Sequence, residues 1–141
     1  MKAAVCRAFG APMKIEDVSL APPGPGEVEV AIKACAICHS DILYADGAWD
    51  SVLPAVLGHE AAGVVEDVGA GVRRLRPGDR VVVTLVRSCG TCPCCEQGFY
   101  GSCETPFPLD DSSPLTAADG APIKQGLRTA AFAERVVVDA S

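Results

Sequence analysis

The chain has 141 residues, which is enough for one domain with its own hydrophobic core. A composition of 49% hydrophobic and 21% charged residues is ordinary for a globular protein, and a formal net charge of −6 argues against a nucleic-acid partner. No signal peptide is visible and no stretch reaches the roughly 20 apolar residues of a membrane-spanning helix, so we expect a cytoplasmic protein without a membrane partner.

Valine and alanine supply most of the apolar residues, and β-branched valine favours strands. In chain order, the alternation of apolar and polar residues and the Gly/Pro turns predict strands at 1–6, 14–20, 28–34, 61–68, 79–86 and 132–138. A short helix is expected over 40–46, with Ser40 as its N-cap.

Two segments carry no periodic pattern. Residues 89–103 are expected to form a loop organised by something other than a core, and residues 104–126, which are polar and proline-rich, a long irregular excursion. No G-x-G-x-x-G motif follows a strand, so no Rossmann (dinucleotide-binding) domain is expected in this chain. Short strands separated by turns predict a mainly β, partly open barrel with a few short helices.

Five cysteines lie within the fifteen residues 89–103, and four of them have the spacing C-x2-C-x2-C-x7-C. In a reducing compartment this density points to metal rather than to disulfides, and four thiolates suit a closed, structural zinc site. An iron–sulfur cluster is the lesser alternative. We expect Cys89, Cys92, Cys95 and Cys103 to be the ligands and Cys94 to be spare, although spacing alone leaves a Cys94-for-Cys95 exchange open.

A second group of metal-ligating residues comes earlier in the chain, at Cys38-His39-Ser40-Asp41 and at Gly58-His59-Glu60. The chain has only two histidines, and both lie in these segments. A catalytic zinc takes three protein ligands and leaves one position for water or substrate. Taken singly, however, Cys38 and His59 are more typical of buried core residues than of metal ligands.

Together these motifs resemble the zinc-dependent alcohol dehydrogenases of the medium-chain dehydrogenase/reductase family. The resemblance rests on the two segments above, on Pro77-Gly78-Asp79-Arg80-Val81, on the four cysteines and on Phe132-Ala133-Glu134, which occur in the family's order and spacing. It implies that residues 1–141 are the GroES-like catalytic domain of such an enzyme, without its nucleotide-binding domain.

The resemblance also implies roles for individual residues. Cys38 and His59 correspond to catalytic-zinc ligands, and Asp41 to the carboxylate that orients the histidine. Ser40 corresponds to the hydroxyl that binds the substrate alcohol and passes its proton outward. Glu60 corresponds to a carboxylate beside the metal that assists ligand exchange.

Further residues are expected to bind cofactor and substrate. His39 corresponds to a contact with the cofactor pyrophosphate, and an apolar alcohol pocket is expected to be walled by Trp49, Leu85 and Phe132. The implied reaction is the reversible oxidation of a small alcohol to an aldehyde or ketone by NAD(P), with zinc stabilising the alkoxide before hydride transfer.

One departure from the family pattern concerns the third catalytic ligand, a cysteine that the family places beyond the cysteine loop. This chain has no cysteine after Cys103, so we expect the fragment alone to be inactive, with Glu60 or water as the substitute ligand. The alternative is a stand-alone, zinc-stabilised module that self-associates, and a homo-oligomer is compatible with either.

Overall fold

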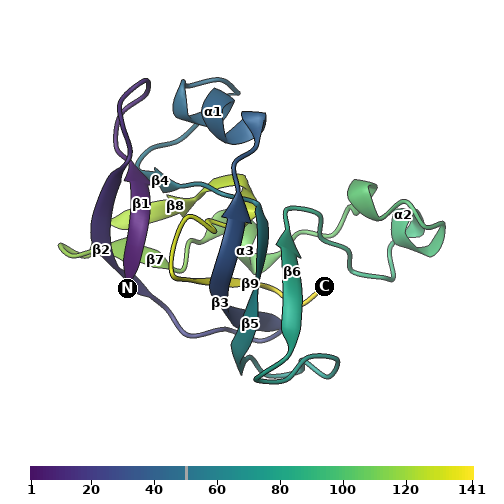
Figure 1. Ribbon diagram of the computed structural model, residues 1–141. Coiled ribbons are helices and arrows are strands. Elements are labelled where there is room, and N and C mark those ends of the chain that lie inside the picture. Colours follow the sequence, from purple (N-terminus) through teal and green to yellow (C-terminus); the bar gives the residue numbers. More distant parts are fainter. Residues whose placement is uncertain (50) are drawn as a thin grey trace.

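The strands divide into a small barrel and a four-stranded side sheet, in a computed structural model that describes residues 1–49 and 51–141 (Figure 1). The barrel closes in the order β1-β2-β7-β8-β4, and the side sheet has the order β6-β5-β3-β9. The barrel strands are β1 (Lys2–Cys6), β2 (Lys14–Leu20), β4 (Ala55–Val56), β7 (Leu115–Ala117) and β8 (Pro122–Gln125). The side sheet contains β3 (Glu27–Ala36), β5 (Glu60–Val68), β6 (Arg80–Thr84) and β9 (Arg135–Asp139).

Helical segments are short. They are α1 (His39–Ala45), α2 (Pro93–Glu96), α3 (Pro108–Asp111) and the 3-10 turns η1 (Tyr100–Ser102) and η2 (Gly126–Arg128). The mainly β architecture with a small barrel is therefore confirmed; the barrel itself is closed, and the free edges belong to the side sheet. No helix among residues 1–49 and 51–141 is long and apolar enough to cross a membrane.

Two expectations for local structure are wrong. The N-cap of α1 is Cys38 and not Ser40, because the Asp41 carboxylate accepts the Cys38 N–H and starts the helix one residue earlier. Residues 104–126 are not irregular, since they contain α3 and the barrel strands β7 and β8. These strands have three and four residues, too few for a period-2 pattern to stand out.

Each strand group has its own apolar core. The barrel encloses Val5, Val18, Val56, Leu115 and Ile123, while the side sheet packs Val28, Val30, Val65, Val83 and Val136. The segment that precedes β9 joins the two groups, because Phe132 O accepts the Ala4 N–H at 2.8 Å and the Ile32 N–H reaches Glu134 O at 2.9 Å. The segments that carry Cys38 and His59 therefore extend from strands that are packed in these two joined cores.

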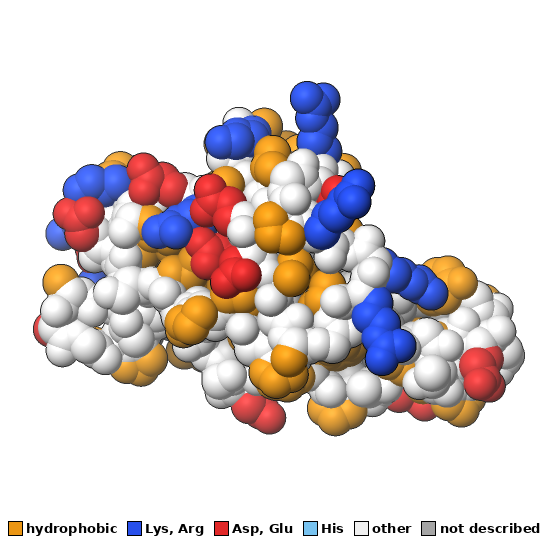
Figure 2. Space-filling view, turned by 90° about the horizontal axis from the view of Figure 1, so that it is seen from below, with side chains coloured by type: hydrophobic (Ala, Val, Ile, Leu, Met, Phe, Trp, Pro, Cys, Tyr) orange, Lys and Arg blue, Asp and Glu red, His pale blue; other side chains and the backbone are white. Residues whose placement is uncertain are grey.

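The cysteine loop, residues 89–103, stands apart from both cores. Figure 1 shows α2 and its loop projecting sideways from the side sheet, while α1 lies across one end of the strands. The opposite face carries acidic and basic side chains of both signs with apolar groups between them (Figure 2). This mixed face offers no single-sign surface of the kind that phosphate backbones require.

Gly69 lies where two chain segments touch. A Cβ added there would meet the Gly24 carbonyl oxygen at 1.7 Å, and the Gly69 N–H also donates to Glu27 O at 2.8 Å. We expect Gly69→Ala to lower the free energy of unfolding by about 3 kcal/mol, because the backbone must move apart. Gly101→Ala is the matched control, since nothing lies within 4 Å of its added Cβ. Urea unfolding at fixed zinc concentration measures both, and equal midpoints would contradict the close contact.

Candidate metal centres

The cysteine loop brings four sulfur atoms together. Sγ atoms of Cys89, Cys92, Cys95 and Cys103 all lie within 4.8 Å of one another, and Cys94 is outside this group. Cys92 caps α2, and Pro93 occupies the first turn, where its missing N–H costs nothing. Four thiol donors in one closed group are the donor set of a structural zinc site, so these residues fit the metal.

Backbone N–H groups prepare this site for negative charge. The N–H groups of Thr91 and Cys92 donate to Cys89 Sγ at 3.4 and 3.2 Å. Hydrogen bonds from the Thr105 side chain and then from Thr91 lower the pKa of the Cys89 thiol to about 5. Burial instead raises the pKa of the Cys95 thiol to about 12. The two shifts run in opposite directions, so Cys89 gives up its proton more readily than Cys95 when a metal binds.

A second group of donors forms where β3 and β5 pair. The antiparallel register sets Ala36 opposite Glu60, so the chain leaving β3 passes the start of β5. As a result, Cys38 Sγ, a ring nitrogen of His59 and a carboxylate oxygen of Glu60 lie within 4.8 Å of one another. We call these three residues the mixed-donor cluster. One thiol, one imidazole and one carboxylate are all zinc ligands, and three ligands leave a position free.

Asp41 organises this cluster from behind and is only 1% exposed. Its carboxylate accepts the N–H groups of Cys38 and Gly58, each at 2.9 Å. Its Oδ1 also lies 3.2 Å from His59 Nδ1. Because Nδ1 faces this carboxylate, Nε2 is the ring nitrogen left for a metal. Asp41 thus joins the start of α1 to the segment that carries His59.

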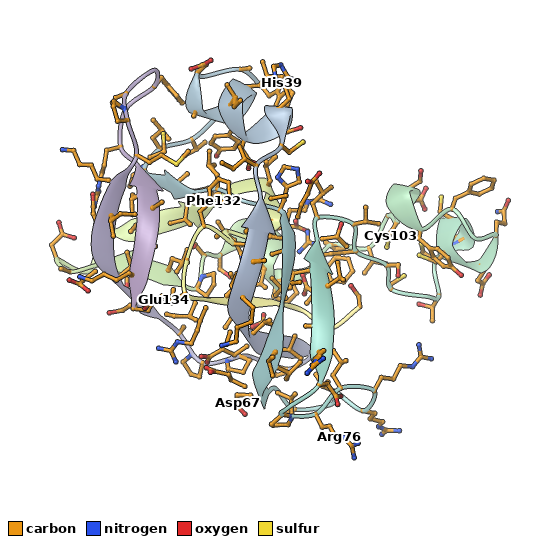
Figure 3. The ribbon with its side chains drawn as sticks, viewed as in Figure 1. His39, Asp67, Arg76, Cys103, Phe132 and Glu134 are labelled. Carbon is orange, nitrogen blue, oxygen red and sulfur yellow. The ribbon has the colours of Figure 1, made fainter. Side chains whose placement is uncertain are left out.

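The remaining predicted residues on α1 lie at the edge of the cluster. Ser40 Oγ is 3.7 Å from Cys38 Sγ, which places the hydroxyl beside the metal donors. His39 is the first residue of α1 and is exposed at that end of the molecule (Figure 3). An open hollow of about 460 Å³ adjoins the cluster. It is lined by His59, Glu60 and apolar neighbours that include Ala34, Ala61, Val82 and Val83.

The three predicted pocket walls do not line one common hollow. Phe132 packs against Gly58, the residue that precedes His59. Leu85 lines a small hollow that it shares with Cys103 of the cysteine loop. Trp49 follows α1 and is 61% exposed. An alcohol pocket formed by all three residues stays a prediction.

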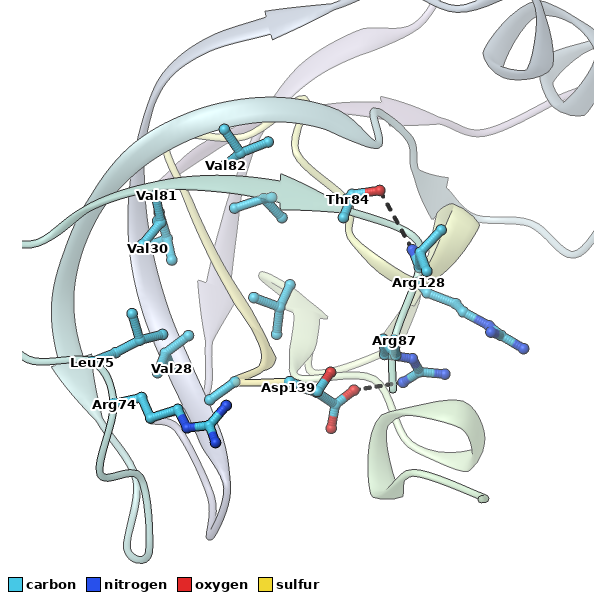
Figure 4. A pocket seen from close by; sticks show the side chains of 15 residues that line it. Val28, Val30, Arg74, Leu75, Val81, Val82, Thr84, Arg87, Arg128 and Asp139 are labelled. Carbon is cyan, nitrogen blue, oxygen red and sulfur yellow. Dashed lines mark hydrogen bonds and ion pairs between the residues drawn. The ribbon is translucent and has the colours of Figure 1, made fainter. Parts of the chain in front are cut away.

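Arg87 is the centre of a buried ion-pair network that no sequence pattern reveals. The guanidinium pairs with Asp139 at 2.6 Å and with Asp110, and it stacks over the Phe107 ring at 4.6 Å from the centroid. It lies at one end of a pocket of about 340 Å³ with a floor of valine side chains, and Arg74 lies at the other end (Figure 4). Arg87 thereby ties the base of the cysteine loop to α3 and β9. This network cannot be predicted from sequence, because Arg87 lies far along the chain from both of its acidic partners.

Comparison with known proteins agrees on one family. A family model described as the alcohol dehydrogenase GroES-like domain matches residues 24–141. A CYP enzymes assisting alcohol dehydrogenase from Catharanthus roseus is 40% identical over 99% of this chain and 39% of its own length. A putative alcohol dehydrogenase D from Mycobacterium tuberculosis is 45% identical over 72% of this chain and 28% of its own length.

Solved structures give the same result. The crystal structure of an alcohol dehydrogenase zinc-binding domain protein from Burkholderia ambifaria superimposes with a TM-score of 0.87 at 36% identity, covering 98% of this chain and 39% of that one. Benzyl alcohol dehydrogenase from Acinetobacter calcoaceticus superimposes with a TM-score of 0.78 at 28% identity, covering 98% of this chain and 38% of that one. The chain thus spans well under half the length of the proteins that it matches.

Proposed function

The chain belongs to the alcohol dehydrogenase GroES-like domain family, and from this premise we propose that it is the metal-holding part of a zinc-dependent alcohol dehydrogenase that uses NAD(P). One observation carries the proposal. Cys38, His59 and Glu60 converge within 4.8 Å, with the Asp41 carboxylate behind the histidine. A structural site needs four protein ligands, whereas three converging donors beside an open hollow suit a catalytic metal.

Cys38, His59 and Glu60 would hold the zinc ion. Bound zinc supplies Lewis acidity, which lowers the pKa of an alcohol hydroxyl. Asp41 keeps His59 oriented and holds the proton on Nδ1, so that Nε2 stays available as a donor. Glu60 is exposed at its strand end, so its carboxylate would be free to assist ligand exchange at a bound metal.

Ser40 is the residue that binds the alcohol and moves its proton. Its Oγ stands 3.7 Å from Cys38 Sγ, so an alcohol hydroxyl bound at the mixed-donor cluster would lie near it. A hydroxyl both accepts and donates, and Ser40 can therefore take the alcohol proton and pass another to water. Exposed His39 at the start of α1 would supply a ring N–H donor for the cofactor pyrophosphate.

The substrate class follows from the walls of the hollow. Ala34, Ala61, Val82 and Val83 are apolar, and Thr84 adds one hydroxyl to the same lining. Such walls favour an alcohol with an apolar body over a polyol. The resemblance to benzyl alcohol dehydrogenase from Acinetobacter calcoaceticus supports an aromatic or primary alcohol as the first compound to test.

The four-cysteine group would serve a different purpose. Its four thiols would fill all four positions of a tetrahedral zinc, which leaves none for substrate. We infer that zinc there organises the cysteine loop and takes no part in the reaction.

Metal counting tests the proposed catalytic site. We expect the 141-residue chain to hold one zinc tightly and a second one weakly, because the second has a carboxylate in place of a third soft ligand. Cys38→Ser should remove the second zinc and leave the first. Cys35→Ser is the matched control, since this cysteine is three residues away and outside both groups. Elemental analysis after dialysis against graded chelator reports both zincs.

Cobalt in the second site then tests the chemistry. Protons of benzyl alcohol should relax faster in the presence of the cobalt-loaded protein, because the hydroxyl reaches the paramagnetic ion. This effect should vanish in Cys38→Ser and persist in Cys35→Ser. The proposed function would be contradicted if Cys38→Ser still bound the second metal, or if cobalt did not change the relaxation of the benzyl alcohol protons.

A further inference from the structure

The residue before His59 is anchored at both of its polar backbone atoms. The Gly58 N–H donates to Asp41 Oδ1 at 2.9 Å. The Gly58 carbonyl accepts two hydrogen bonds, from Thr129 Oγ1 at 2.6 Å and from the Ala131 N–H at 2.9 Å. The peptide group that joins Gly58 to His59 is therefore held from a segment about seventy residues further along the chain.

Gly58 has no freedom to relax away from these contacts. Its φ is +90°, a conformation that residues with a Cβ rarely adopt. A Cβ at this position would meet the Phe132 ring at 2.6 Å and the Phe132 backbone nitrogen at 2.7 Å. The Phe132 N–H also donates to Leu57 O at 2.8 Å. Residues 57–58 are thus in direct contact with the segment 129–132.

The loop that presents Thr129 is itself in an unfavourable backbone conformation. Leu127, Arg128 and Ala130 have φ values of 49°, 65° and 58°, all in the left-handed region. Thr129 is nevertheless 1% exposed. Its N–H reaches Gly126 O at 3.2 Å, and Gln125 Nε2 donates to its carbonyl at 3.2 Å. Surrounding structure imposes this geometry, and backbone strain of this kind gathers at functional sites.

We propose that Thr129 is a positioning residue for His59, and this inference rests on the proposed metal site. The Thr129 hydroxyl fixes the peptide that carries His59, while Asp41 fixes the Nδ1 side of its ring. The two contacts together aim Nε2 at the position between Cys38 and Glu60. Thr129 touches neither metal nor substrate, so its effect passes entirely through His59.

Two variants separate the hydroxyl from the bulk of the side chain. Thr129→Val keeps the shape and loses the donor, and Thr129→Ser keeps the donor. Thr116→Val, on barrel strand β7, is the control for loss of a threonine hydroxyl elsewhere. Each chain is loaded with one equivalent of zinc for the four cysteines and then titrated with cadmium. Nitrogen-15 spectra of the imidazoles follow His59, with His39 as the internal reference, because the chain has only two histidines.

We expect Thr129→Val to shift or broaden the His59 ring signals before any cadmium is added and to leave those of His39 unchanged. Its cadmium affinity at the mixed-donor cluster should fall about 10–100-fold, the usual effect of losing a group that orients a metal ligand. Thr129→Ser should stay within about threefold of the parent chain because its donor is intact. Thr116→Val should match the parent in both measurements.

The outcomes distinguish this inference from the proposed function. Unchanged His59 signals and cadmium affinity in Thr129→Val would overturn the positioning role, even if that variant unfolds more easily. If Thr129→Ser behaves like Thr129→Val, the hydroxyl is not the active group and the inference also fails. A third outcome is that cadmium shifts the His59 ring signals in none of the chains while Thr129→Val alone shifts them before cadmium is added. In that case the positioning role stands and the proposed metal site fails.

Discussion

Replacement of Cys95 by serine should release the metal from the cysteine loop and unfold residues 89–103, whereas Cys94→Ser should do neither. Cys95 is the buried member of the four-sulfur group, and Cys94, its neighbour in sequence, lies outside that group. The loop has almost no apolar burial of its own, so metal binding supplies its folding free energy. Removing a group that merely orients a ligand costs about 10–100-fold in metal affinity, and losing a ligand should exceed about 100-fold.

Zinc content after dialysis and limited proteolysis within 89–103 provide the measurements. The barrel should survive, because its core of Val5, Leu115 and Ile123 does not touch the loop. If Cys95→Ser keeps its zinc and Cys94→Ser loses it, the ligand is Cys94 and not Cys95, which is the alternative that the spacing leaves open. Retention by both variants would contradict a four-cysteine site.

Asp41→Ala should lower the free energy of unfolding by about 3–5 kcal/mol, because it leaves several buried polar groups without a partner. The carboxylate serves the N–H groups of Cys38 and Gly58 and the His59 ring, and all of these contacts are within 3.2 Å. Asp41→Asn should lower the free energy of unfolding by less, since the amide oxygen can still accept one of these hydrogen bonds. Some loss remains, because the NH2 group then faces another donor.

Asp46→Ala is the matched control for this prediction. Asp46 is an exposed residue at the other end of α1, and its removal should change stability by no more than about 0.5 kcal/mol. Urea unfolding at saturating zinc measures all three variants under the same metal load. If Asp41→Ala falls within about 1 kcal/mol of Asp46→Ala, the buried carboxylate does not organise the site as its contacts indicate.

Prediction from sequence worked where the signal is local. Valine-rich alternating segments identify β3, β5 and β6 to within a few residues, because each is long enough to display a period of two. The spacing of the four cysteines identifies their group, since two-residue gaps let one loop turn its sulfurs to a common centre. The His59 and Cys38 segments are recognisable by their motifs alone.

Prediction failed where short elements depend on distant partners. The strands β7 and β8 become strands by pairing with β2 and β4, which lie far from them in sequence. The Arg87 network is equally invisible, because Asp110 and Asp139 reach it from separate elements. The N-cap of α1 also moved by two residues, since a buried carboxylate outweighed the usual preference for serine.

The sequence by itself determined the family, the mainly β architecture and the four sulfur donors, because each is written in consecutive or regularly spaced residues. The tertiary structure decided how close the expected residue Glu60 comes to Cys38 and His59, because the register of β3 on β5 brings the three donors within 4.8 Å of one another. It also decided that Asp41 and Thr129 hold the two sides of Gly58. Contacts between residues so far apart arise only when the barrel and the side sheet close on each other, and no local pattern encodes them.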